Sequence, residues 1–172
     1  KLSGLQSLQL HTCGITAGAM ATLTLPNSIR ALRLTQSAAM LVPLIDNTVL
    51  EQLSHYTSLQ SLALNGLMQC TEAGVVGLIT KLPNLTKLSW GTFPMTDRIA
   101  AVLPAQLTHL ALGNCSQISN NGFGVLIPSL TSLVSLHLQK ANGFEAFVPP
   151  LVNTANNIAQ LSKTVRDLYL DT

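Results

Sequence analysis

The sequence predicts an α/β protein in which short parallel strands alternate with short helices and stack along one axis as a solenoid. A triplet of aliphatic residues with the spacing L-x-x-L-x-L recurs seven times, with starts 22 to 32 residues apart. The segments between the triplets carry the capping residues and prolines that begin and end helices. Units of this length are typical of solenoids, in which each unit buries its apolar side chains against its neighbours.

The recurring triplets define the expected strands. They are Leu5, Leu8, Leu10; Ile29, Leu32, Leu34; Leu59, Leu62, Leu64; Leu85, Leu88, Trp90; Leu107, Leu110, Leu112; Leu133, Leu136, Leu138; and Val165, Leu168, Leu170. The last two members of each triplet follow the period-two pattern of a strand with one apolar face. The connections are long enough for crossovers, so we expect the strands to lie parallel.

The segments between the triplets are expected to form short helices. Residues 71–79 and 96–103 each begin with a threonine and then an acidic residue, as an N-cap and a first turn would, and Thr16 and Ser119 hold comparable positions. The prolines expected to follow these helices and lead into the next strand are Pro26, Pro83, Pro104 and Pro128. A last helix is expected over residues 149–161, opened by its two prolines.

Segments 107–115 and 116–123 carry a family resemblance. The first reads LTHLALGNC, close to L-x-x-L-x-L-x-x-N/C, and the second reads SQISNNGF, similar to the end of C-x-x-I-T-D-x-G-L. The chain therefore resembles the leucine-rich-repeat family, in its cysteine-containing subtype, over essentially its whole length. The resemblance implies a horseshoe of about seven repeats, with a parallel concave sheet and convex helices. It also implies protein binding, and in this subtype an intracellular adaptor such as the substrate-recognition part of a ubiquitin-ligase-like protein.

The family's Asn or Cys position after each strand is filled by varied residues in this chain. They are Cys13, Ser37, Leu67, Phe93, Cys115 and Ala141. Leu67, Phe93 and Ala141 have no side chain that could bond the loop backbone, so other groups are expected to satisfy those amides. Three residues further on, apolar side chains recur, and Cys70 at that position is expected to be a small core residue.

The composition bears on the class of function. Charged residues make up 9% of the chain and the net charge is +2, which argues against nucleic-acid binding. No apolar run approaches the roughly 18 residues of a membrane helix, so no membrane insertion is predicted. The three cysteines fit neither a zinc nor a redox motif. Free thiols favour a reducing, intracellular compartment, although an extracellular or surface location stays open.

The side chains that alternate with the strand leucines point to the opposite face, which is the expected partner-binding surface. The candidate binding residues are Gln9, His11, Arg33, Lys87, His109, His137, Tyr169 and Asp171. Seven strands about 4.8 Å apart would span roughly 30 Å, enough for a standard protein interface. Arg33 and Tyr169 are of the residue types that dominate interface hot spots. The alternatives are a partner on the convex face and a concave face that is only solvated.

His109, His137 and Asp167 fall on neighbouring expected strands, and residues of these types can form a metal or general-base site. These residues lack a nucleophile and the open sheet offers no pocket, so neither enzyme activity nor a cofactor is predicted. Glycosylation sequons occur at Asn84 and Asn114 about as often as chance allows, and the expected burial of Cys115 disfavours a glycan at Asn114.

Residues 1–172 are expected to form a single leucine-rich-repeat domain. Neither end carries a polar capping element, so we expect a segment of a longer solenoid, or neighbouring chains that cover both ends. The predicted function is a protein-binding scaffold or recognition module. The low charge also suits a structural subunit of a large multiprotein assembly. A third hypothesis is a segment that positions substrate for a catalytic domain.

Overall fold

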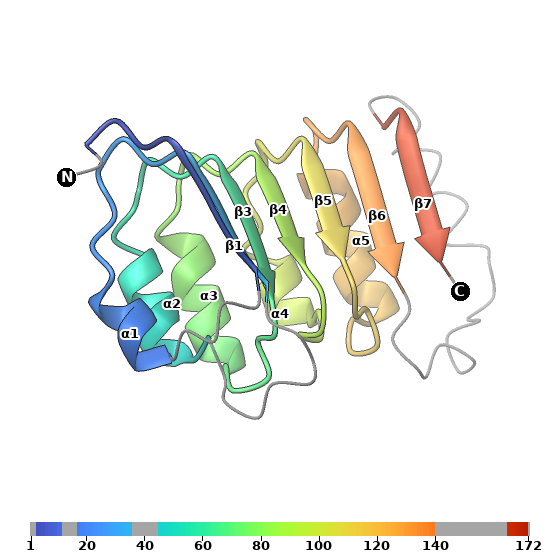
Figure 1. Ribbon diagram of the computed structural model, residues 1–172. Helices are drawn as coiled ribbons and strands as arrows, with labels where there is room; N and C mark the ends of the chain where they lie inside the picture. The colour runs from blue at the N-terminus through green and yellow to red at the C-terminus, as the bar shows by residue number, and fades with distance from the viewer. Residues whose placement is uncertain (1–2, 12–16, 36–44, 140–164, 172) are drawn as a thin grey trace.

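The computed structural model describes residues 3–11, 17–35, 45–139 and 165–171, and its strands form one sheet (Figure 1). The strands are β1 (Ser7–His11), β2 (Ala31–Thr35), β3 (Ser61–Asn65), β4 (Lys87–Trp90), β5 (His109–Leu112), β6 (Ser135–Gln139) and β7 (Asp167–Asp171). They follow one another across the sheet in chain order, and every neighbouring pair is parallel. The chain is an α/β protein with a single open parallel sheet, as the triplet spacing predicted.

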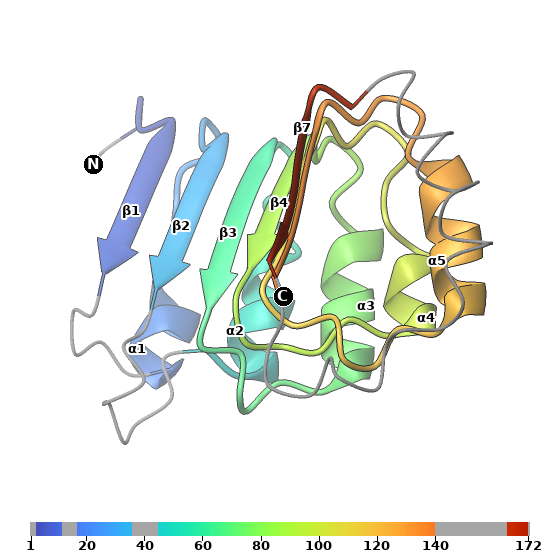
Figure 2. The same cartoon turned by 90° about the vertical axis from the view of Figure 1, so that its right-hand side faces the viewer.

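One layer of helices covers one face of this sheet. The described helices are α1 (Ala17–Thr22), α2 (Asn47–Leu53), α3 (Glu72–Thr80), α4 (Asp97–Ala100) and α5 (Asn120–Ser129). Each helix packs against the next in chain order. Figures 1 and 2 show all of them on the same side of the sheet, so the described residues leave its other face uncovered.

The strand leucines lie in register and form the core between the sheet and the helices. One column across the sheet consists of Leu8, Leu32, Leu62, Leu88, Leu110, Leu136 and Leu168. From Leu32 to Leu136 these side chains are at most 3% exposed. Burying one leucine stabilises a protein by about 1.5–3 kcal/mol, so this column is a main source of stability.

Trp90 interrupts the second column, in which the neighbouring strands place Leu64 and Leu112. Its side chain is 3% exposed, and its indole N–H has no hydrogen-bond partner among the described residues. A buried donor without a partner costs about 1–3 kcal/mol. The large apolar ring must offset that cost through its burial.

The loops that carry Leu67 and Phe93 satisfy their amides through backbone carbonyls, as expected. Both side chains are buried in the core. The amide of Cys70 donates to the carbonyl of Leu67 at 3.0 Å, and the amide of Met95 donates to the carbonyl of Asn114 at 2.8 Å. Apolar residues at this position therefore add to the core without leaving those loop donors unpaired.

The predicted helix starts at Thr71, Thr96 and Ser119 are confirmed. Each residue is extended and serves as the N-cap of α3, α4 or α5. Each hydroxyl oxygen accepts a hydrogen bond from the amide three residues later, at 3.2–3.3 Å. Helix α2 was not individually predicted, although Asp46 caps it in the same way by accepting from the amide of Val49 at 3.0 Å.

The predicted helix ends are wrong in two places. Helix α4 stops at Ala100, well before residue 103. The chain then continues in a turn whose hydrogen bonds span three residues, such as that from the Val102 amide to the Ile99 carbonyl. Pro104 disfavours the helical conformation for the residue that precedes it. Pro128 lies inside α5 instead of after it. It falls in the last, irregular turn, where the Leu130 amide donates to the Ile127 carbonyl three residues back.

Several expectations lie outside the described residues. They are the cap at Thr16, the roles of Cys13, Ser37 and Ala141, and the helix over residues 149–161. Pro26, Pro83 and Pro104 do follow helices, as predicted.

A ladder of polar side chains links the helix starts. The first residues of α2, α3 and α4 each accept a hydrogen bond from the N-cap hydroxyl of the following helix. The three pairs, which we call the cap ladder, are Asn47 with Thr71, Glu72 with Thr96, and Asp97 with Ser119. Two of the acceptors also bond the cap's backbone, because the amide of Thr71 donates to Asn47 Oδ1 at 2.9 Å and the amide of Ser119 donates to Asp97 Oδ1 at 2.6 Å.

The cap ladder depends on the fit between neighbouring side chains. A Cβ added to Gly74 would lie 2.3 Å from Oδ1 of Asn47, and one added to Gly122 would lie 2.1 Å from Oδ1 of Asp97. These glycines leave the space in which the two short acceptors reach the next cap. At α4 the corresponding residue is Ile99, and there the acceptor is the longer Glu72.

Replacing Asp97 with alanine is expected to lower the free energy of unfolding by about 1–3 kcal/mol, because the Ser119 amide and hydroxyl both lose their acceptor. Urea unfolding monitored by circular dichroism would measure the change. Glu51→Gln is the control, since it disturbs only an exposed ion pair with Lys81. Equal unfolding midpoints for the two variants would contradict a stabilising role for the ladder.

Candidate functional site

The face of the sheet opposite the helices carries the residues that alternate with the strand leucines. One row across the strands runs Ala31, Ser61, Lys87, His109, Ser135 and Asp167, and the next runs Arg33, Ala63, Ser89, Ala111, His137 and Tyr169. The parallel register brings residues up to about 140 positions apart in the chain (33 and 169) onto one surface. Any site on this face is therefore built from several strands.

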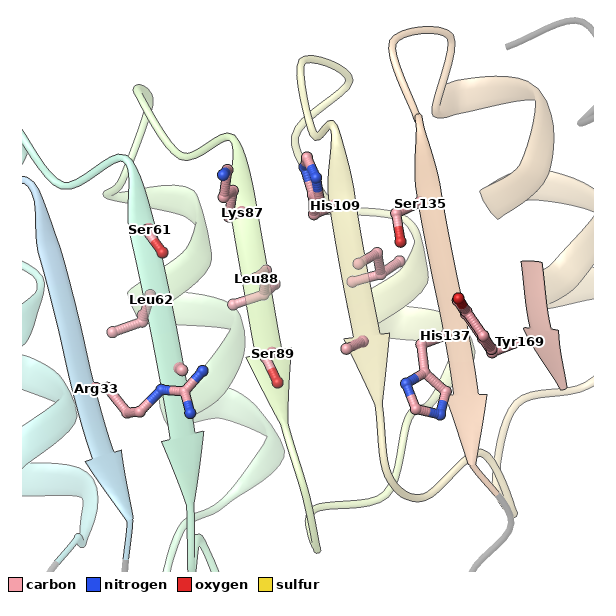
Figure 3. A pocket seen from close by; sticks show the side chains of 13 residues that line it. Arg33, Ser61, Leu62, Lys87, Leu88, Ser89, His109, Ser135, His137 and Tyr169 are labelled. Carbon is pink, nitrogen blue, oxygen red and sulfur yellow. The ribbon is translucent and has the colours of Figure 1, made fainter. Parts of the chain in front are cut away.

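A hollow of about 280 Å³ lies on this face and extends from β2 to β7 (Figure 3). We call it the sheet hollow. Its lining side chains include Arg33, Ser61, Ala63, Lys87, Ser89, His109, Ala111, Ser135, His137 and Tyr169. The sequence predicted an open face with no pocket and did not predict this hollow, which is shallow and open. Its volume is just below the roughly 300 Å³ at which small-molecule pockets begin.

Five of the candidate binding residues meet around the sheet hollow. They are Arg33, Lys87, His109, His137 and Tyr169. Gln9 and His11 lie on the same face but on β1, outside the hollow, and His11 Nδ1 is 2.5 Å from Thr35 Oγ1. Asp171 is the last residue of β7, and its side chain lies outside the described part.

Aromatic rings form the β6–β7 end of the sheet hollow. The rings of His137 and Tyr169 lie with centroids 5.6 Å apart and planes tilted by 50°. Tyr169 is 59% exposed, so a large apolar surface is open to solvent there. Aromatic side chains held in this way supply contact area at low entropic cost when a partner binds.

Two cations stand on the other side of the sheet hollow. Arg33 and Lys87 are exposed, and neither forms an ion pair with any described residue. Between their strands, on β3, lie the short side chains of Ser61 and Ala63, and the buried Leu62 also lines the hollow there. His109 follows Lys87 on β5, where its Nδ1 lies 2.9 Å from Thr108 Oγ1.

The small residues of the hollow were not singled out by sequence reasoning. Ser61, Ala63, Ser89 and Ala111 are half-buried and form the floor between the larger side chains. A signal was present, because successive strands place small residues at the same face positions. Small side chains in register leave space that longer flanking side chains enclose.

The ion pairs of the described residues lie on the helical side. Lys81 Nζ is 2.9 Å from Glu51 Oε1, and Arg98 Nη1 is 3.6 Å from Glu72 Oε2. The hydrogen bond from Lys81, with its charge, lowers the pKa of the Glu51 carboxyl below its usual value. Glu51 and Glu72 on the helical side are thus already paired with cations, and neither ion pair lies at the sheet hollow.

The two described cysteines do not form a reactive site. Burial raises the pKa of Cys115 to about 12, and burial followed by the nearby charge of Asp46 raises that of Cys70 to about 12. Both thiols therefore stay protonated near neutral pH, whereas nucleophiles and metal ligands need the thiolate. Cys70 is partly buried against the core, and its Sγ lies 3.7 Å from the Ile45 carbonyl oxygen, in keeping with a small core residue.

The considered metal site does not assemble in the described part of the chain. His109 and His137 lie on adjacent strands two residues out of register, and the His137 ring instead lies tilted against that of Tyr169. Within the described ranges, no three His, Cys, Asp or Glu side chains are placed to share an ion.

Comparison with known proteins gives no family assignment. No family model matches the chain, and no curated protein sequence matches it. None of the described helices has the length and apolar character to cross a bilayer. The interpretation of the site therefore rests on the geometry of the sheet face.

Proposed function

We propose that this chain is a leucine-rich-repeat solenoid that binds a protein partner on the concave face of its sheet. The observation that carries the proposal is the sheet hollow, with two cations at one side that pair with no carboxylate in the described ranges and an aromatic pair at the other. Such a mixture of aromatic and Arg side chains around a shallow depression is typical of interface hot spots.

The architecture supports a surface made for a large partner. The hollow draws on six strands, and its small volume spread across them suits an extended surface better than an enclosed small molecule. Seven strands also give a face roughly 30 Å across. The strands and helices alternate with the triplets of the sequence, which supports the repeat interpretation.

The same proposal covers the cellular setting. Cys70 and Cys115 are free and sheltered. Free buried thiols are common in reducing compartments, so we propose an intracellular location.

Site-specific photocrosslinking tests the proposal. A photoreactive residue would replace Ala63 or Ala111 on the floor of the sheet hollow, or Ala73 on the exposed surface of α3 as a matched control. In an extract of the organism that makes the protein, we expect protein adducts from the two floor positions and none from Ala73.

A second pair of variants tests whether those adducts depend on the side chains of the sheet hollow. Arg33→Glu and Tyr169→Ala alter exposed side chains and leave the core intact. Each is expected to reduce the adduct yield several-fold, since charge and aromatic area are lost from the surface. Adducts from Ala73 alone, or adducts that both variants leave unchanged, would overturn the concave-face proposal.

A further inference from the structure

The charges on the sheet face are unevenly distributed. On β1 to β6, the outward positions carry Arg33 and Lys87 and no carboxylate, whereas on β7 Asp167 stands on the same face. The sheet face thus has a cationic part over β2–β4, which lines the hollow, and an acidic residue on β7 that does not line it. This pattern attracts anionic groups to one region of the face and repels them from another.

The chain offers these cations few partners of its own. It has only seven Asp and Glu residues in all. Three of them, Glu51, Glu72 and Asp97, are engaged in hydrogen bonds on the helical side. Arg33 and Lys87 are therefore available for acceptors that another molecule brings.

The spacing of the two cations fits a peptide better than a phosphate group. Arg33 lies on β2 and Lys87 on β4, so about 10 Å of sheet separates their strands. In a peptide with the polyproline II conformation, which repeats every three residues, side chains three positions apart lie on the same side and about 9 Å apart. A phosphate is usually held by several donors at one point, whereas two separate cations each suit a single carboxylate, and Arg can bind one with two parallel bonds.

We propose that the sheet hollow binds an acidic peptide segment of a protein partner, with two carboxylates on Arg33 and Lys87 and an apolar side chain against Tyr169. This inference rests on the proposed function and names the chemistry of the partner. On β3, between the strands of the two cations, Ser61 and Ala63 have short side chains, which leaves room for a peptide backbone beside Arg33 and Lys87. Single-stranded nucleic acid is less suited, because the hollow presents one aromatic pair instead of a row of stacking platforms.

Fluorescence anisotropy with defined peptides tests the inference. The probe is a labelled Gly/Ser peptide of about twelve residues with Glu at every third position, and a matched peptide carries Gln at those positions. The Glu peptide is expected to bind the whole chain at low salt and to weaken as salt is raised, while the Gln peptide stays unbound at the same concentrations.

Two double variants with the same change in net charge locate the binding. Arg33→Gln with Lys87→Gln is expected to weaken the Glu peptide about tenfold or more. Lys81→Gln with Arg98→Gln removes two exposed cations from the helical side and is expected to change the affinity by no more than about twofold. Unchanged circular dichroism and urea midpoints would show that all variants remain folded.

Three outcomes would overturn the inference. They are equal binding of the Glu and Gln peptides, equal loss in the two double variants, and tighter binding of oligothymidylate than of the Glu peptide. If the Glu peptide does not bind while photocrosslinking from Ala63 and Ala111 gives protein adducts, the acidic-peptide inference is wrong and the partner binds this face through other chemistry. Failure of the crosslinking from the floor would instead remove the proposed function itself.

Discussion

Replacing Gly113 with alanine is expected to lower the free energy of unfolding by about 3 kcal/mol or more. A Cβ on this residue would lie 2.2 Å from the carbonyl oxygen of Gly91 and 2.8 Å from its Cα and carbonyl carbon. All three atoms are backbone, so no side chain can rotate away. Relief requires the ends of β4 and β5 to move apart, which strains the bond from the Gly113 amide to the Trp90 carbonyl at 2.8 Å.

Other glycines of the chain supply the controls for this measurement by urea unfolding. Gly77 in α3 and Gly124 in α5 have no atom within 4 Å of an added Cβ, so alanine there should leave stability unchanged or raise it by up to about 1 kcal/mol. Gly91→Ala should be milder than Gly113→Ala, because its nearest contact is the movable side chain of Asn65 at 2.5 Å. A Gly113→Ala midpoint equal to that of Gly77→Ala would contradict the close approach of the two strand ends.

Replacing Leu110 with alanine is expected to lower the free energy of unfolding by about 2–5 kcal/mol, since its side chain is 2% exposed inside the leucine column. The loss combines the transfer of methyl groups from the core with the cavity left behind. Leu168→Ala changes the same residue type in the same column, but at 39% exposure the expected loss is below about 1 kcal/mol.

Thermal and urea unfolding of the two leucine variants would measure this difference. The wild-type chain and both variants should show the same circular dichroism spectrum before unfolding. A similar loss of stability in both variants would mean that every leucine of the column contributes equally, which would contradict the different exposures of Leu110 and Leu168. A negligible loss at Leu110 would contradict its place in the core.

The strand positions could be predicted because their signal is local and repeated. Leu62 and Leu64, for instance, have polar or small neighbours on both sides, and only a strand puts both leucines on one face. The N-caps were predictable for the same reason, since Thr71 bonds within its own first turn. The helix ends were not predictable, because α4 and α5 end in irregular turns whose hydrogen bonds leave no pattern in the sequence.

The candidate site was predictable in its members but not in its shape. Period-two alternation placed Arg33, Lys87 and Tyr169 on one face. The hollow was missed because it depends on how small residues such as Ala63 and Ala111 line up in register across strands. Register between strands follows from tertiary packing, which no single segment of the chain reveals.

The cap ladder makes neighbouring helix starts depend on one another. Thr71 is held by Asn47, and the helix it begins supplies Glu72, which holds Thr96. If the first turn of one helix frays, the N-cap of the next helix loses its hydrogen-bond acceptor. Local unfolding on the helical side can therefore spread from one helix to the next along the chain. Among the residues that the structure describes, Arg33 and Lys87 on the opposite surface take part in no such chain of mutual dependence. The molecule can thus vary the chemistry of its open face, residue by residue, while the side that carries the helices must change in matched pairs.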